Sequence, residues 1–199
     1  YRAGSVNEQV ISLMDLTATT LSIAGIQRPG EMQSRVFLGN QPDPPRQYAF
    51  SARDRIDETI VRQRSVRGPR YHYVRNFTPG AGFITLNRYK EKCFLVKPLM
   101  RELHATGQLT GAAQDLMQPF PAEQLYDTLR DPFEIHNLAN SRRSKTQRIL
   151  ESMRTALDTW MVQTGDLGHI PEPDEVVHPF TKEMHDWFGT PDWYTQDKR

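Results

Sequence analysis

The chain has 199 residues, enough for roughly one domain and part of a second if a domain averages ~150 residues. Its 25 Lys and Arg residues nearly balance 24 Asp and Glu residues, so no overall field draws it to nucleic acid or to a membrane surface. The single cysteine, Cys93, excludes an internal disulfide and a four-cysteine zinc site, and no apolar stretch approaches the ~20 residues of a membrane span.

A strand followed by a helix is predicted first. Residues 10–13 form a short apolar run, and helical spacing of apolar residues follows as far as Gly25. Asp15 is predicted to cap the helix, and Gly25 to end it in the left-handed conformation. One strand and one helix bury little surface, so we expect the rest of their sheet to lie upstream of Tyr1. The proline-rich residues 27–46 are predicted to be loop.

A small antiparallel sheet is predicted next. Segments rich in β-branched or aromatic residues, as strands are, occur at 47–51, 60–66, 71–75 and 124–127. Gly68 and Pro69 mark a turn between the second and third segments, which indicates a hairpin.

The clearest predicted helix covers residues 143–163. Its large apolar side chains fall on one face, at Ile149, Leu150, Met153, Leu157, Trp160 and Met161. We expect this face to pack on the sheet. Residues 87–106 are predicted to be helical in part, with Pro98 in the first turn of the better half.

The last segment, residues 164–199, is rich in proline and contains Trp187 and Trp193. Because tryptophan-rich segments seldom stay in water, we expect an ordered tail that wraps around the rest of the protein. One short helix is predicted near residues 182–188.

Three blocks of the sequence together resemble the C-terminal portion of type I, formylglycine-dependent sulfatases of the alkaline phosphatase superfamily. They are VISLMDLTATTLSIAGI at 10–26, SARDRIDE at 51–58 with RSVRGPRYHYVRN at 64–76, and EQLYDTLRDPFEIHNLA at 123–139. The middle block is similar to that of a bacterial subgroup related to sulfamidases and heparan-type sulfatases. Ala18 stands where proline is usual in the family.

The resemblance implies an α/β fold, or α+β for this chain taken alone. Residues 1–46 would be the tail end of the catalytic domain, a remnant βα unit of its large mixed sheet followed by a loop. Residues 47–163 would form the C-terminal subdomain, a small sheet of about four antiparallel strands packed on the long helix, and 164–199 the wrapping tail. The activity implied for the parent is hydrolysis of a sulfate ester, or less readily a sulfamate, on a carbohydrate.

The family's nucleophile arises from a C/S-x-P-x-R motif, which this sequence lacks. In the family, the calcium ligands and sulfate-binding residues also precede the first block. We therefore expect neither catalytic nor metal-binding residues in this chain, which alone should be inactive. Calcium and formylglycine are expected in a full-length parent, whose N-terminal catalytic domain would be the partner. Related proteins are mostly periplasmic, extracellular or lysosomal.

Arg53, Asp54 and Arg55 are the candidate substrate-binding residues. They sit at the end of a predicted strand, and two guanidinium groups around a carboxylate suit an anionic or hydroxyl-rich ligand. By resemblance, this loop contacts the sugar near the mouth of the active site. Two other interpretations stay open: an ion network that joins two subdomains, and a solvated loop.

The hairpin of residues 62–75 is rich in arginine, and a sulfated polysaccharide could bind there. Arg62 and Arg64 share one strand face, however, so a solvated face with cross-strand partners is the simpler interpretation. No nucleic-acid motif accompanies the patch. The six histidines lack the spacing of a metal site.

Two other functions remain possible from the sequence. One is a stand-alone carbohydrate-binding or interaction module derived from a sulfatase. The other is phosphoryl transfer by a related superfamily member.

Overall fold

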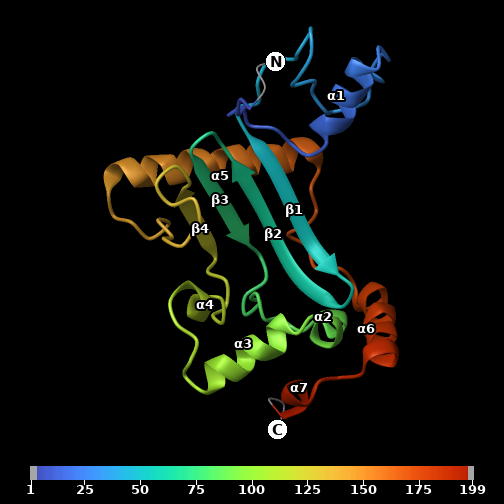
Figure 1. Ribbon diagram of the computed structural model, residues 1–199, viewed down its shortest axis with the longest axis vertical. Helices are drawn as coiled ribbons and strands as arrows, with labels where there is room; N and C mark the ends of the chain where they lie inside the picture. Colours follow the sequence, from blue (N-terminus) through green and yellow to red (C-terminus); the bar gives the residue numbers. More distant parts are fainter. Residues whose placement is uncertain (1–3, 197–199) are drawn as a thin grey trace. The chain divides into compact units, whose positions relative to one another are not determined.

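The computed structural model describes residues 4–196 and contains eleven helices and strands within that range (Figure 1). In chain order they are α1 (Asp15–Ile23), β1 (Ala49–Ile56), β2 (Thr59–Arg67), β3 (Tyr71–Asn76), α2 (Arg88–Cys93), α3 (Val96–Ala105), α4 (Ala112–Asp115), β4 (Glu123–Asp127), α5 (Ser144–Thr164), α6 (Asp174–Phe188) and α7 (Asp192–Gln196). Within the described residues, no helix is both long and apolar enough to cross a membrane.

The residues pack into two compact units. The first unit contains Tyr1–Ser51, Ser65–Tyr73 and Leu125–Trp160, and the second contains Ala52–Arg64, Val74–Gln124 and Met161–Arg199. The division of a full-length parent at residues 46 and 163 stays a prediction.

The sheet has four strands in the order β1-β2-β3-β4, which confirms the predicted small antiparallel sheet. Gly68 and Pro69 form the turn between β2 and β3, as predicted. A two-residue turn at Asp57 and Glu58 joins β1 to β2, with Asp57 in the left-handed region at φ 53°. This tight turn lets β1 continue to Ile56, so Arg53, Asp54 and Arg55 lie within a paired strand and not at its end.

In the first unit, α5 supplies the apolar face that the sequence predicted. Leu150, Met153 and Leu157 are buried, and such side chains contribute about 1.5–3 kcal/mol each by leaving water. The ring of Trp160 stacks on that of Phe50, with centroids 5.2 Å apart and planes 3° apart. The helix therefore packs where β1 begins.

The start of the first unit departs from the prediction. Residues 10–13 form no strand, because Val10 makes only one isolated bridge, to Arg46. Asp15 is not the cap but the first residue of α1, and its side chain is buried. Arg46 binds both of its carboxylate oxygens, at 2.7 and 2.6 Å. Gly25 ends the helix at φ 71°, as predicted.

The environment of Asp15 explains why a buried carboxylate is tolerated there. Burial opposes its ionisation, but the hydrogen bonds from Arg46 and from the backbone N–H groups of Arg35 and Ser12 outweigh that cost. Together they hold the pKa of Asp15 at about 2.

The tail residues up to 196 pack within the second unit. The ring of Phe188 in α6 meets that of Tyr89 in α2, with centroids 5.5 Å apart, and the Arg101 guanidinium of α3 lies 3.8 Å from the Trp193 ring centroid. Trp187, in contrast, is 66% exposed. The expectation that both tryptophans pack against the protein therefore holds for Trp193 and not for Trp187.

Two predicted helices in the second unit differ in how well they match the structure. Pro98 lies in the first turn of α3, as predicted. The helix predicted near residues 182–188 exists but is longer than predicted: α6 begins at Asp174 and continues through Pro179. Asp174 and Glu175 in its first turn favour that start by complementing the helix dipole.

Candidate functional site

Neighbouring residues of β1 line two different cavities of the second unit. Successive side chains of a strand point to opposite faces, and Arg53 and Asp54 follow this rule. Asp54 lines a cavity of about 460 Å³, which we call the carboxylate-lined cavity because Asp166 and Glu172 also line it. Arg53 lines a cavity of about 240 Å³, which we call the basic cavity.

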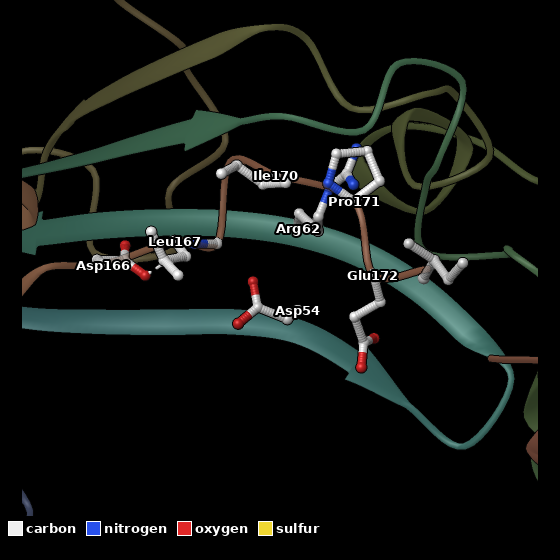
Figure 2. A pocket seen from close by; sticks show the side chains of 9 residues that line it. Asp54, Arg62, Asp166, Leu167, Ile170, Pro171 and Glu172 are labelled. Atoms are coloured by element: carbon white, nitrogen blue, oxygen red, sulfur yellow. Dashed lines mark hydrogen bonds between the residues drawn. The ribbon is translucent and has the colours of Figure 1, made fainter. Parts of the chain in front are cut away.

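The carboxylate-lined cavity is built from two strands and one connecting segment. Figure 2 shows Asp54 on β1 and Arg62 on β2, while a single stretch of chain supplies the other labelled side chains, Asp166, Leu167, Ile170, Pro171 and Glu172. Sequence reasoning missed this segment. Residues more than 100 positions away in the sequence leave no local pattern that would pair them with β1.

Arg64 neutralises two of the acidic groups around this cavity. Its side chain is 1% exposed, and its Nη2 donates to Asp166 Oδ1 at 2.8 Å. Its Nη1 lies 2.8 Å from Asp54 Oδ1 and donates to the carbonyl oxygen of Arg53 at 3.0 Å. The hydrogen bonds that Arg64 donates to Asp166 lower the pKa of Asp166 and raise that of Arg64. The expectation that Arg64 faces solvent is therefore wrong.

The chain crosses directly over the Arg64 guanidinium at Gly168. A Cβ atom at that position would lie 1.2 Å from Arg64 Nη2 and 2.1 Å from its Cζ. Only a residue without a side chain allows this approach. The burial of Arg64 thus depends on a glycine that no local sequence pattern singles out.

Arg55 is also held by groups within the second unit. Its Nε donates to Glu172 Oε2 at 2.7 Å, and its guanidinium lies 4.1 Å from the ring centroid of Phe180. The hydrogen bond from Arg55 lowers the pKa of Glu172. Of the three candidate residues, Asp54 and Arg55 are thus engaged in ion pairs.

The basic cavity has the opposite charge. Its lining includes Arg53, Lys90 and Lys97 and no carboxylate. The Nε of Arg53 is buried and has no hydrogen-bond partner. The Lys97 side chain is buried, and its Nζ donates to the carbonyl oxygen of Thr85 at 2.8 Å. Burial lowers the pKa of both Arg53 and Lys97.

The arginines of the hairpin at residues 62–75 largely have partners. Arg67 pairs with Glu134 at 2.7 Å and Arg70 with Asp127 at 2.6 Å, both in the first unit. These pairs argue against an open basic patch, but neither is a cross-strand pair, since Glu134 and Arg70 lie outside the strands. Within residues 4–196, no three His, Cys, Asp or Glu side chains gather as they would around a metal ion.

Comparison with known proteins gives three relevant curated relatives. The chain is 36% identical over 176 residues to an ulvan-active sulfatase of Formosa agariphila, a match that covers 86% of this chain and 28% of that protein. It is 29% identical over 172 residues to another ulvan-active sulfatase of the same organism, covering 83% of this chain and 32% of that protein. It is 29% identical over 192 residues to the human N-sulphoglucosamine sulphohydrolase, covering 88% of this chain and 37% of that protein.

The chain thus spans about a third or less of two of these relatives and 37% of the third. No family model matches it. Among solved structures, it is similar to a 2-O GAG sulfatase, with a TM-score of 0.48, 22% identity and coverage of 76% of this chain and 25% of that one. The same TM-score, with 13% identity, is found for a protein solved with its substrate D-glucosamine-2-N,6-O-disulfate, of which 25% is covered, against 79% of this chain.

Proposed function

We propose that this chain is the C-terminal part of a sulfatase and that it completes the substrate pocket of a sulfuric ester hydrolase that acts on a sulfated carbohydrate; its similarity to three sulfatases supports this. The observation that carries the proposal is the state of Arg53. Its Nε is buried and has no hydrogen-bond partner among the described residues, and it lines a cavity that contains no carboxylate. A guanidinium in that position is suited to bind an oxyanion or sugar hydroxyl.

Asp54 and Arg55 act in this proposal as positioning residues. Asp54 holds Arg64, whose Nη1 also binds the carbonyl oxygen of Arg53, so the backbone of β1 is fixed at the residue that contacts substrate. Arg55, two residues further along β1, is held in turn by its ion pair with Glu172. The set thereby orients the Arg53 side chain before substrate binds, which reduces the entropy lost on binding.

The chemical step belongs to the catalytic part of the parent, where formylglycine would supply the nucleophile and calcium the charge stabilisation. The described residues of this chain offer no cluster of three metal ligands, and we assign no metal-dependent step to them. Their part is to bind and orient the sugar.

An exposed apolar surface supports the catalytic domain as the partner. In the first unit, large apolar side chains of the segment 6–26 are open to solvent, namely Val6, Ile11, Leu13, Met14, Leu16, Ile23 and Ile26, with Leu13 82% and Ile23 71% exposed. Seven large exposed apolar side chains within one segment are more than the single ones found scattered over an ordinary surface, and such a concentration is typical of an interaction site. We propose that the large domain of the parent covers it.

The experiment is a kinetic comparison in a full-length protein that carries this chain. Arg53→Gln should lower kcat/KM for a sulfated sugar by about 10-fold or more, because a charge-assisted hydrogen bond to substrate is lost. Arg130→Gln is the matched control, since that side chain is 80% exposed and lies in the first unit. Equal kcat/KM for both variants and the unaltered protein would remove Arg53 from the substrate pocket.

The 199-residue chain alone should not hydrolyse an aryl sulfate. Turnover by the purified chain, absent from a mock purification, would show that the chain has its own nucleophile and would refute the proposed division of labour.

A further inference from the structure

We propose that the basic cavity binds a second, non-reacting oxyanion of the substrate, so that the preferred sugar carries a carboxylate or an additional sulfate beside the sulfate that is hydrolysed. This inference rests on the proposed function and narrows its substrate class. It concerns the cavity between β1 and the segment of α2 and α3, lined by Arg53, Lys90 and Lys97.

The charges of this cavity are not balanced from within. Arg53 has no carboxylate partner, and Lys97 uses one of its three N–H donors on the carbonyl oxygen of Thr85. Glu91, the nearest acidic group that acts on Lys97, is bound by Arg101 through both carboxylate oxygens, at 2.5 and 2.8 Å. Lys97 is buried and Arg53 is half-buried, and a cation removed from water is costly unless an anion accompanies it, so the cavity is suited to an anionic ligand.

The walls of the cavity would strengthen this interaction. Ile56, Phe83, Phe94, Val96 and Phe120 provide most of the remaining lining, and the first four are 39–52% exposed, so a bound sugar would cover apolar surface that now faces water. Apolar and aromatic walls also suit the C–H face of a sugar ring. An anionic sugar therefore matches both parts of the lining better than a free ion does.

The size of the cavity limits the ligand. Its volume of about 240 Å³ corresponds to roughly eight water molecules at ~30 Å³ each, below the 300–1,000 Å³ typical of sites for drug-sized ligands. One acidic group with part of the ring that carries it fits this space. A longer stretch of polysaccharide does not.

Under the proposed function the reacting sulfate is held in the catalytic part of the parent, so an oxyanion bound in the basic cavity is a second one. The lining contains no cysteine, histidine or carboxylate that could serve as nucleophile or general base. Its two threonine hydroxyls are already committed, since that of Thr59 donates to the carbonyl oxygen of Leu86 and that of Thr85 accepts from the N–H of Gly82. The cavity is thus a binding site that fixes the substrate from one end.

The test is a titration of the 199-residue chain at constant ionic strength with inorganic sulfate, glucuronate, glucose 6-sulfate and neutral glucose. Calorimetry measures affinity, and the NMR signal of the Arg53 side-chain N–H reports the site. We expect the sugar anions to bind and to shift that signal, and glucose to do neither. Tighter binding of glucuronate or of glucose 6-sulfate distinguishes a carboxylate from a sulfate as the second group.

Arg53→Gln should weaken binding of the sugar anions by about 10-fold or more. This variant should fold, which circular dichroism checks, because the Arg53 side chain makes no hydrogen bond. Arg130→Gln should leave affinity unchanged. Absence of anion binding to the folded chain, or equal affinity in the Arg53→Gln variant, would overturn the inference.

Kinetics of a full-length protein that carries the chain separate this inference from the proposed function. Hydrolysis of a singly sulfated neutral sugar as fast as that of a sulfated uronic acid would overturn the inference and leave the sulfatase function intact. Binding of sugar anions at Arg53, without hydrolysis of any sulfated sugar, would support the cavity and refute the function.

Discussion

The two cavities reached from β1 differ in how their charges are satisfied. In the carboxylate-lined cavity, Asp54 and Asp166 are bound by Arg64, and Glu172 is bound by Arg55. In the basic cavity, Arg53 has no such partner. Neighbouring residues of one strand thus serve two purposes: on one side the three carboxylates are paired with arginines of the same unit, although the Nε of Arg62 there has no hydrogen-bond partner, and on the other side the cations have no carboxylate in their lining.

This difference means that charge alone does not identify a binding site. The three acidic groups of the larger cavity are a feature of stability, because their partners come from the same unit. The smaller cavity is the better candidate for substrate. Four predictions test this distinction.

Arg64→Leu should have the largest effect. It leaves Asp166 and Asp54 without their buried partner, and breaking a buried ion network in this way costs about 3–5 kcal/mol of unfolding free energy. Urea denaturation measures the loss. Arg67→Leu removes a 47% exposed side chain of the same strand and should cost under about 1 kcal/mol. Equal losses for the two variants would contradict the closed network.

Gly168→Ala should come second, at about 1–3 kcal/mol, because the new methyl group overlaps the Arg64 guanidinium and must displace it. Thermal denaturation compares this variant with Gly30→Ala, where a Cβ atom meets nothing within 4 Å. Equal melting temperatures for the two variants would show that the chain does not cross over Arg64 as described.

Acidification should weaken the carboxylate-lined cavity and not the basic one. The folded pKa of Asp166 is lowered from its ordinary value of 3.8 by the hydrogen bonds from Arg64, so its contribution is complete above pH 3.8 and is lost as pH falls below it. Arg53 and Lys97 stay protonated over that range. Unfolding free energy measured from pH 5 to pH 2 should fall less steeply in Asp166→Asn, and an unchanged slope would contradict the role of Asp166.

Glu172→Gln should have the smallest effect, under about 1 kcal/mol, because its carboxylate is 37% exposed and surface ion pairs contribute little. Glu8→Gln, at an exposed residue, is the control for denaturation. In a full-length protein, a loss of kcat/KM in Glu172→Gln without a matching loss of stability would support the positioning of Arg55. A large loss of stability would show that the pair is more than a surface contact.

Much of the fold could be predicted from the sequence because it depends on local patterns. Alternation and turn residues located the four strands, and helical spacing located α5. The segment at residues 10–13 was predicted to be a strand on its apolar content, but it has no neighbouring strand with which to form more than one bridge. Local pattern cannot show whether such a neighbour exists.

The candidate site was predictable only in part. The resemblance singled out Arg53, Asp54 and Arg55, but their different surroundings depend on residues far away in the sequence, above all Asp166 and Glu172. Arg64 is predicted to be solvent-exposed because it shares one face of β2 with Arg62. Its burial is explained only by the segment around Gly168, which is distant in the sequence. Lys97 entered no sequence-based site, since a single lysine near a helix start carries no signal.

The claim that Arg53 and Lys97 hold an oxyanion is tested most directly by crystals of the 199-residue chain soaked in selenate, an anomalously scattering analogue of sulfate. The predicted result is a selenium peak within hydrogen-bond distance of both side chains, absent in crystals of Arg53→Gln. A well-ordered basic cavity without selenium, or a peak in the carboxylate-lined cavity instead, would contradict the claim.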